Sequence, residues 1–582
     1  MSRKLIEKAN TLLAAEKGTV YKNDDPEVRV ALAYPNTYHV GMSNLGIHQI
    51  YAHLNKRPDT VCERVFLPDK EDMAEYAASK TLLFSLESKR LVKGFDILAF
   101  SISFELDYLH VLTMLHLSGI PVLKRERTHH DPLIIFGGAC SFFNPEPLAN
   151  FFDAVIVGEG EEVIGKCINA FKRERKKTRL ELLQSISTIP GVYVPEFYDI
   201  QYHSDGTIKA RVKREPSAPD RIIKRTVRNF DTLSAATAIL TPNTEFSNMY
   251  LTEIMRGCNR HCRFCLAGSI YLPPRTLGIE AAKKHAQKAD ALCGKTGLVG
   301  AAISDYPFMQ ELCSSIRGAV SVSSLRADAL HKKLLARLAK SGHKTIALAP
   351  EAGSERLRKV INKGITEEDI LDAVNKVFEA GIPNLKLYFI IGLPTETQED
   401  IEAIPALAAC VHDIQLQHAR QRGRIGKITL SVNAFVPKPF TPFQWEPMDS
   451  ILSLNRKLRF LSRAVKKIGN TDLIHDLPKR DYLQAFLSNG DRRAGSVLYA
   501  AHKNGGSWRK AARIAAVDID FFAHRRRGFD EVLPWDFIDI GMRKEYLKNE
   551  YDRARNGIFT PPCSVGSCTA CGVCETRTTD EH

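Results

Sequence analysis

Short β-branched and apolar segments recur along most of this chain, and each ends in small or turn-forming residues before a segment of helical character. Residues 28–34 (VRVALAY) run into Pro35, and residues 132–136 run into Gly137 and Gly138. Strands that alternate with helices favour a parallel sheet covered by helices, which binds ligands at the carboxyl ends of its strands. The sequence therefore predicts an α/β fold whose functional loops follow the strands.

The pattern divides the chain into four parts. Residues 1–195 predict a doubly wound, Rossmann-like parallel sheet, and residues 196–245 predict an irregular connector. Residues 246–445 repeat the strand–helix alternation often enough to predict a partial β/α barrel, and residues 446–582 are mainly helical and basic. Strands are expected at residues 28–34, 96–103, 132–136, 154–157, 252–255, 298–303, 319–323, 344–349, 385–391 and 429–435.

Composition excludes a disordered, fibrous or membrane-spanning chain. Of the 582 residues, 44% are hydrophobic and 25% are charged, as in globular proteins. No apolar run reaches the roughly 18 residues of a membrane span, and the first residues read as an amphipathic helix and not as an export signal. We therefore expect a cytoplasmic protein. The net charge of +14 suits either an acidic partner such as nucleic acid or an ordinary basic enzyme surface.

Seven of the thirteen cysteines fall into two short groups. Their spacings are C-x3-C-x2-C and C-x4-C-x2-C-x2-C, formed by Cys258, Cys262 and Cys265 and by Cys563, Cys568, Cys571 and Cys574. Clustered cysteines in an intracellular chain indicate metal or redox chemistry. The first group can hold three irons of a [4Fe–4S] cubane and leave the fourth open, or hold zinc with His261 or a distant residue. The second group has enough ligands for a complete iron–sulfur cluster or a closed zinc site.

The segment MRGCNRHCRFC (residues 255–265) resembles the signature of the radical S-adenosylmethionine (radical SAM) enzymes. Four further segments match the family in order: 300–307 (GAAISDYP), 323–326 (SSLR), 349–366 and 386–397. The resemblance implies that the first cysteine group is catalytic and binds a [4Fe–4S] cluster, whose open iron chelates S-adenosylmethionine. One electron then cleaves this cofactor to methionine and a 5′-deoxyadenosyl radical, which abstracts hydrogen from the substrate.

By carry-over from the family, six residues are candidates for contact with S-adenosylmethionine. They are Phe264 beside the adenine, Ser304 or Asp305 near the amino group, Ser324 and Arg326 near the ribose or carboxylate, and Glu351 as a further contact. The chain departs from the family at residues 300–307, where the usual glycines and glutamate are replaced. An internal ion pair is the alternative role for Arg326 and Glu351.

The first part of the chain resembles the cobalamin-binding domain that precedes many radical SAM domains. The matching residues are Ser101, Ser103, Gly137, Gly138, Gly158 and Glu159. The loop NTYHVGMSNLG (residues 36–46) lacks the Asp-x-His-x-x-Gly pattern whose histidine ligates cobalt. Either cobalamin binds without that ligand, or the domain has kept only the fold.

Three function classes remain open. The favoured class is a cobalamin-dependent radical SAM enzyme that transfers a methyl group to an unactivated centre. The second is a methylthiotransferase acting on tRNA or protein, although Cys62, Cys140 and Cys167 do not resemble that family's cysteine motifs. The third is a non-catalytic iron–sulfur or RNA-associated protein. An enzyme of either of the first two classes would need an electron donor such as flavodoxin or ferredoxin. RNA is one candidate substrate.

Overall fold

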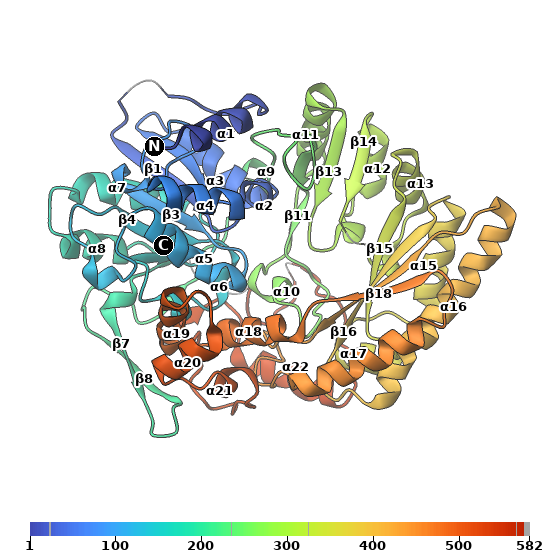
Figure 1. The fold of residues 1–582 in the computed structure, drawn as a ribbon. Coiled ribbons are helices and arrows are strands. Elements are labelled where there is room, and N and C mark those ends of the chain that lie inside the picture. The colour runs from blue at the N-terminus through green and yellow to red at the C-terminus, as the bar shows by residue number, and fades with distance from the viewer. Residues whose placement is uncertain (23–24, 228, 234, 324, 566, 575–582) are drawn as a thin grey trace. The chain divides into compact units, whose positions relative to one another are not determined.

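The chain divides into two compact units (Figure 1). The computed structural model describes residues 1–22, 25–227, 229–233, 235–323, 325–565 and 567–574. The first unit consists of Met1–Asn248, Phe486–Ile519 and Asp530–Ile540. The second consists of Met249–Ala485, Asp520–Phe529 and the residues from Gly541 onward. The predicted connector is thus part of the first unit, and the carboxyl-terminal residues contribute to both units.

A six-stranded sheet forms the centre of the first unit, with strand order β2-β1-β3-β4-β5-β6. Its strands are β1 (Val28–Tyr34), β2 (Thr60–Phe66), β3 (Ile97–Ser101), β4 (Leu133–Gly137), β5 (Ala154–Ile156) and β6 (Val192–Tyr193). All neighbours are parallel except β5 and β6. This confirms the doubly wound sheet. The order 2-1-3-4-5 reverses direction between β1 and β3, where such sheets bind ligands.

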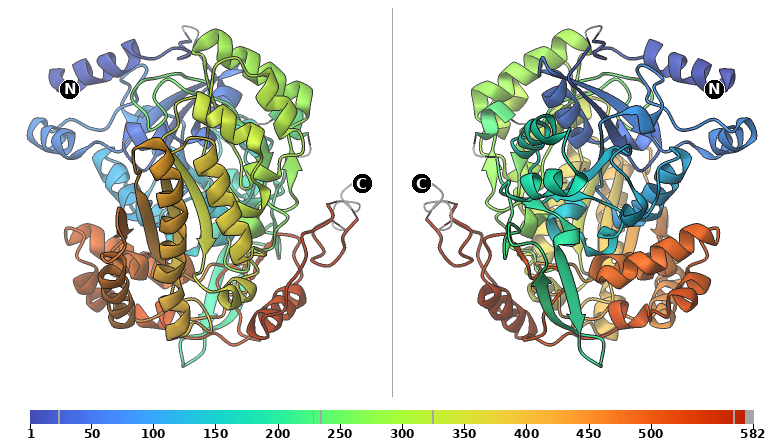
Figure 2. Two further views of the ribbon diagram at one scale, coloured as in Figure 1. Left: turned by 90° about the vertical axis from the view of Figure 1, so that its right-hand side faces the viewer. Right: turned by 90° about the vertical axis from the view of Figure 1, so that its left-hand side faces the viewer.

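Helices and short strands cover this sheet. The helices are α1 (Arg3–Ala14), α2 (Tyr38–Gly41), α3 (Leu45–Asn55), α4 (Lys70–Ser79), α5 (Tyr108–Leu117), α6 (Ala139–Phe143), α7 (Val163–Glu174), α8 (Arg179–Ser187), α9 (Phe230–Leu233), α19 (Arg492–Lys503) and α20 (Trp508–Ala515). The hairpin of β7 (Tyr198–Tyr202) and β8 (Ile208–Lys213) projects from the unit (Figure 2), and β9 (Ile222–Ile223) pairs with β19 (Ile538–Asp539).

Strand β2 is missing from the sequence prediction because charged residues interrupt it. Glu63 and Arg64 lie in the middle of the strand, yet both are buried. Arg64 donates to the carboxylates of Glu16 and Glu87 at 2.7 Å, and the Glu63 carboxylate accepts from the hydroxyl of Ser85 at 2.6 Å. Buried charges are tolerated where they are paired and hydrogen-bonded, and these partners come from distant residues.

Seven parallel strands in chain order form the second unit and confirm the partial β/α barrel. They are β10 (Tyr250–Glu253), β13 (Lys295–Val299), β14 (Ala319–Val322), β15 (Thr345–Glu351), β16 (Asn384–Ile391), β17 (Ile428–Ala434) and β18 (Thr471–His475). They lie in two sheets, β10-β13-β14 and β15-β16-β17-β18, which one parallel bridge between Leu325 and Leu348 connects. The strand expected at residues 298–303 ends at Val299, because Ile303–Asp305 forms a 3-10 turn.

The helices of the second unit follow the strands. They are α10 (Ala267–Ile270), α11 (Ile279–Leu292), α12 (Met309–Ser315), α13 (Lys332–Lys340), α14 (Glu355–Val360), α15 (Glu367–Glu379), α16 (Gln398–Arg422), α17 (Ile451–Val465), α21 (Asp520–Ala523) and α22 (Lys544–Arg555). Helix α18 (Pro478–Asn489) spans the boundary between the units, and an antiparallel ribbon pairs β11 (Met255–Arg256) with β12 (Arg275–Thr276). None of the described helices combines the length and apolar composition that crossing a bilayer requires.

Candidate metal and cofactor sites

Strands β10 and β11 lead directly into the first cysteine loop, residues 258–265. Cys258, Cys262 and Cys265 are partly buried, and none is in a disulfide. His261 has a φ of 53°, which turns the chain between the first two cysteines. Burial, together with the neighbouring thiols of Cys262 and Cys258, raises the pKa of Cys265 to about 12. Cysteine thiolates are the ligands of iron–sulfur clusters, so the chemistry of these three donors suits such a cluster.

Two buried side chains, those of Asn362 and Arg263, connect this loop to the residues around the end of α14 by hydrogen bonds. Asn362, which has no exposed surface, places its side-chain nitrogen 3.3 Å from the carbonyl oxygen of Arg260 and 3.2 Å from that of His261. Arg263 is also fully buried and donates to the carbonyl of Val360 at 2.9 Å. The loop therefore rests on the segment after α14, where the sequence reads Asn-Lys-Gly.

The structure brings together most of the residues predicted to bind S-adenosylmethionine. The buried Ser304 hydroxyl accepts a hydrogen bond from the backbone N–H of Arg326 at 3.1 Å. Asp305 forms a two-pronged ion pair with Arg260 at 2.6 and 2.8 Å. Phe264 is half-buried within the cysteine loop. Ser324 lies outside the described residues.

Arg326 and Glu351 both have protein partners, as the ion-pair alternative proposed. Arg326 donates to Asp328 at 3.0 Å and to the carbonyl oxygen of Lys363 at 2.9 Å. Glu351 accepts from the Lys363 ammonium at 3.2 Å and has a φ of 67° at the end of β15. Left-handed backbone in a residue other than glycine is costly and often marks a functional site.

Two charged residues of this network are absent from the sequence prediction. Arg260 lies inside the cysteine motif and joins Asp305 to Asp328, with which it pairs at 2.9 Å. Lys363 lies in the Asn-Lys-Gly segment and its side chain is largely buried. Their position inside the quoted motifs was the only signal available, because their partners come from other strand ends.

The second cysteine group, residues 563–574, lies in the same unit as the first. Cys571 is buried, and the other three cysteines are half-buried. Burial and the neighbouring Cys568 thiol raise the pKa of Cys563 to about 12, with smaller contributions from Cys571 and Cys574. The four thiols are therefore close enough to interact. Throughout the described part of the chain, no three or more His, Cys, Asp and Glu side chains are arranged to hold a single metal ion.

The residues predicted to bind cobalamin divide into two sets. Ser101, Ser103, Gly137 and Gly138 lie at or just beyond the carboxyl ends of β3 and β4. Gly138 has a φ of +96°, and a Cβ atom there would lie 2.7 Å from the carbonyl oxygen of Ile102. The Ser103 hydroxyl accepts from Asn44 at 3.2 Å, across the point where the strand order reverses. This set therefore lies at the strand ends beside the reversal point.

The other set, Gly158 and Glu159, contacts another segment of the same chain. Gly158 forms a parallel bridge with Arg225, and a Cβ atom on Gly158 would lie 2.3 Å from the Arg225 carbonyl oxygen. The buried Glu159 carboxylate accepts from the backbone N–H of Val227 at 2.7 Å. The loop after β5 therefore binds residues 225–227, and the structure gives it a role in packing.

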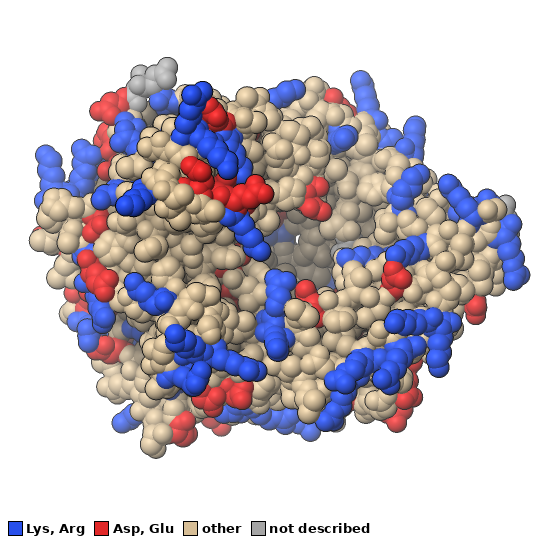
Figure 3. All heavy atoms as spheres, in the orientation of Figure 1, with Lys and Arg blue, Asp and Glu red and all other residues tan. Residues whose placement is uncertain are grey.

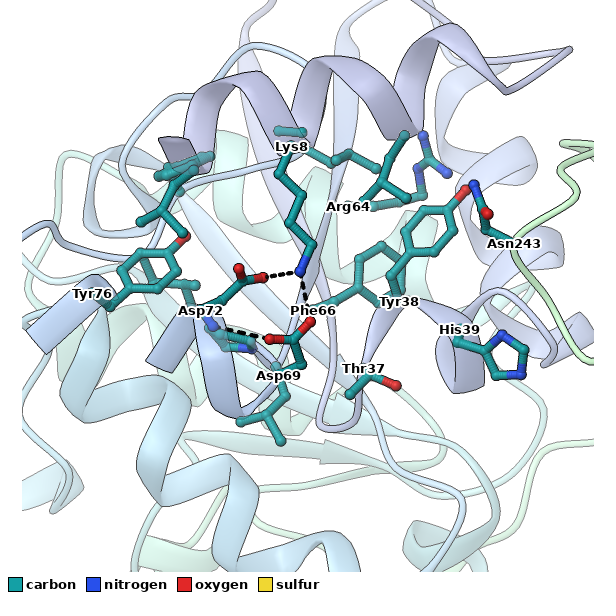
Figure 4. A pocket seen from close by; sticks show the side chains of 18 residues that line it. Lys8, Thr37, Tyr38, His39, Arg64, Phe66, Asp69, Asp72, Tyr76 and Asn243 are labelled. Atoms are coloured by element: carbon teal, nitrogen blue, oxygen red, sulfur yellow. Dashed lines mark hydrogen bonds and ion pairs between the residues drawn. The ribbon is translucent and has the colours of Figure 1, made fainter. Parts of the chain in front are cut away.

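A cavity of about 430 Å³ lies beneath α1 in the first unit (Figure 4). Tyr38 and His39 of α2 and Phe66 of β2 contribute to its wall. Lys8 of α1 reaches across it to Asp69 and Asp72, with which it pairs at 2.6 and 2.7 Å. Most of its other lining side chains are apolar, and the sequence did not predict it.

Comparison with known proteins identifies two matched regions. The model for radical SAM proteins, N-terminal, matches residues 46–195, and the model for the radical SAM superfamily matches residues 252–408. An uncharacterised protein of Methanocaldococcus jannaschii is 33% identical over 480 residues, which cover 81% of this chain and 90% of that protein. The threonylcarbamoyladenosine tRNA methylthiotransferase MtaB of Aquifex aeolicus is 21% identical over 336 residues, which cover 54% of this chain and 71% of that protein.

One solved structure is similar over most of the chain. It is the cobalamin-dependent S-adenosylmethionine radical enzyme OxsB with aqua-cobalamin and S-adenosylmethionine bound. The match covers 91% of this chain and 79% of that chain at 14% identity, with a TM-score of 0.43.

Proposed function

Because the chain belongs to the radical SAM superfamily, we propose that Cys258, Cys262 and Cys265 hold a [4Fe–4S] cluster that binds S-adenosylmethionine. The observation that carries this proposal is the loop itself, which presents three partly buried thiols, none in a disulfide, just after the first strands of a parallel β/α unit. When bound, such a cluster supplies an open iron and one electron for cleavage of S-adenosylmethionine. The polypeptide holds the loop and orients the cofactor.

The charged residues beside the loop are suited to orient S-adenosylmethionine. Arg326 and Lys363 act electrostatically on the thiols. Burial raises the pKa of Cys258 and of Cys265, and the charge of Arg326 opposes that rise at Cys258 while the charge of Lys363 opposes it at Cys265. We assign the cofactor's carboxylate to these two groups. The hydrogen bond from the Arg326 N–H to Ser304 fixes the backbone from which that side chain extends.

The test is formation of 5′-deoxyadenosine, which requires no knowledge of the substrate. The full-length chain is purified anaerobically, supplied with iron and sulfide, and incubated with S-adenosylmethionine and dithionite. Cys262→Ala is expected to lose the product by at least 100-fold, whereas Cys410→Ala, at an exposed cysteine outside the loop, retains it. Product formation by Cys262→Ala at the parent rate would refute the assignment.

The second cysteine group supports a second iron–sulfur cluster as part of the proposal. Four cysteines within twelve residues are enough ligands for a complete cluster. Two cubanes correspond to about eight irons per chain, and the double variant Cys568→Ser/Cys571→Ser is expected to hold about four. About four irons and one zinc in the parent chain would assign the group to zinc instead.

We extend the proposal to cobalamin at the carboxyl ends of β1, β3 and β4, with methyl transfer as the favoured reaction. Support comes from the strand order and from Ser103, Gly137 and Gly138 beside the reversal point. One cobalt per chain after anaerobic purification with cobalamin is the expected result. If no cobalt is found, the sheet would instead bind a substrate or a partner. The main support for methyl transfer would then be lost.

RNA modification is the second candidate function, and one surface favours it. Helix α17 and the two residues that follow its end display exposed cations that have no ion-pair partner within the described structure: Arg456, Arg459, Arg463, Lys466 and Lys467. The spacing of three and four residues places them along one side of the helix, and Lys and Arg side chains line that surface in Figure 3. Such a stripe is complementary to a phosphate backbone. The relative from Aquifex aeolicus is named as a tRNA enzyme.

A further inference from the structure

The segment that precedes and begins the second cysteine group contacts the first cysteine loop. The backbone N–H of Cys563 donates to the carbonyl oxygen of Asn259 at 2.9 Å. The hydroxyl of Tyr546 lies 3.2 Å from Nδ1 of His261. Asn259 and His261 both lie between the first two cysteines of the loop. Residues 285 and 304 positions apart in the sequence are therefore hydrogen-bonded beside the proposed cluster.

One buried amide joins the two segments. Besides the carbonyl groups of Arg260 and His261, the side-chain nitrogen of Asn362 lies 3.0 Å from the carbonyl oxygen of Thr560. Its side-chain oxygen accepts from the backbone N–H of Thr560 at 2.8 Å. Asn362 thus uses both ends of its amide, and loss of either segment would leave buried polar groups without partners.

One buried guanidinium makes the same connection. Arg263, between Cys262 and Cys265, donates to the Glu550 carboxylate of α22 at 3.0 Å and to the carbonyl oxygen of Ile558 at 2.8 Å. The Thr560 hydroxyl donates to the same carboxylate at 2.8 Å. A buried charge is stable only while its partners remain in place, so the carboxyl-terminal segment and the loop depend on each other.

The loop itself has little regular structure to hold its shape. Between β11 and α10 it contains only turns, bends and irregular backbone. Ordering such a segment costs about 1–2 kcal/mol per residue in backbone entropy. Contacts that order the loop before metal binds reduce the entropy cost that metal binding must offset.

We infer that residues 546–563 clamp the first cysteine loop in a single shape, with Asn362 and Arg263 as positioning residues through which the clamp acts. The clamp consists of contacts between polypeptide groups alone. Its consequence for the cluster rests on the proposed function, so the two are tested separately.

The first test measures hydrogen exchange in the full-length chain after its iron has been removed by a chelator. Asn362→Gly deletes the amide but keeps a residue that accepts the φ of 53°. Backbone amides of residues 257–265 and 558–564 are expected to exchange at least tenfold faster, while those of β16 do not change. Asn470→Gly, at an exposed position with a φ of 49°, is the matched control and leaves both segments at the parent rate.

Thr560→Val is a second variant of the same size. It removes the hydroxyl that accepts from Arg263 of the loop at 3.2 Å and donates to Glu550 at 2.8 Å. It is expected to accelerate exchange in the same two segments. Parent rates in residues 257–265 in both variants would overturn the inference. Faster exchange throughout the second unit would also overturn it, because the residues would then support the fold and not the loop.

The second test follows iron transfer to a chelator from the reconstituted chain. Asn362→Gly is expected to release the iron of the first site at least fivefold faster than the parent and than Asn470→Gly. Equal release rates would refute the consequence for the cluster. If the parent chain holds no iron at this loop, the proposed function fails, and the exchange experiment still decides the clamp.

Discussion

At the scale of single residues, His48 links two segments of the first unit and sets a pH dependence. Its buried ring accepts at Nδ1 from the backbone N–H of Ala238 at 3.2 Å and donates from Nε2 to the carbonyl of Met42 at 2.9 Å. Burial lowers the pKa of His48 from 6.5 to about 4. Between these values the unfolded chain binds a proton that the folded chain does not, so the free energy of unfolding falls as the pH drops from 6.5 to 4.

The expected contribution of His48 over this interval is about 3 kcal/mol, since each unit of pKa corresponds to about 1.4 kcal/mol. His48→Gln removes the titration and keeps a donor for Met42, so its unfolding free energy should vary less across this range. Urea unfolding at several pH values between 7 and 4.5 measures the slope. His39→Gln, at an exposed ring, is the control, and a slope in His48→Gln equal to the parent's would contradict the assignment.

Arg64 is the residue on which the buried charges of β2 depend. It is fully buried and pairs with the carboxylates of Glu16 and Glu87. Arg64→Met keeps much of the volume but leaves two buried carboxylates without their cation, so we expect a loss of about 3–5 kcal/mol in unfolding free energy. Urea unfolding followed by tryptophan fluorescence, to which Trp508 and Trp535 of the first unit contribute, measures it. A loss below about 1 kcal/mol would show that the carboxylates find other partners.

At the scale of secondary-structure elements, the loop after β5 is fixed by its contact with residues 225–227. Gly158→Ala places a Cβ atom against the backbone of Arg225 and adds strain at a φ of +106°, so we expect a loss of about 2 kcal/mol or more. Gly505→Ala is the control, since its φ is +62° and a Cβ there meets nothing within 4 Å. Both are measured by urea unfolding, and equal losses would mean that the clash is relieved without cost.

At the scale of the whole molecule, the net charge of +14 bears on the choice of substrate. If the α17 stripe binds RNA, the affinity for a tRNA transcript falls as salt rises. Replacing Arg456, Arg459 and Arg463 with alanine should reduce the slope of log K against log salt by about 2, at about 0.7 per lost phosphate contact. A triple alanine variant of Lys332, Lys333 and Lys340 on α13 is the control. A slope unchanged in the α17 variant would exclude this surface.

The sequence by itself determined the alternation of strands and helices, both parallel architectures and the composition of the two cysteine groups. These features depend on periodicity and spacing within a few tens of residues, which local hydrophobic patterning controls. The strand 28–34 begins and ends where it was expected, because a β-branched run is followed at once by proline. Which of the candidate residues hold a metal or cofactor is still a prediction.

Only the tertiary structure decided which distant segments meet. It placed Cys563 beside Asn259, gave Arg64 its two carboxylates, and joined residues 225–227 to the loop after β5. It also distributed the carboxyl-terminal residues between two units. The physical reason is that the burial of a charged or polar group is favourable only with a specific partner, and nothing in the local pattern identifies a partner hundreds of residues away.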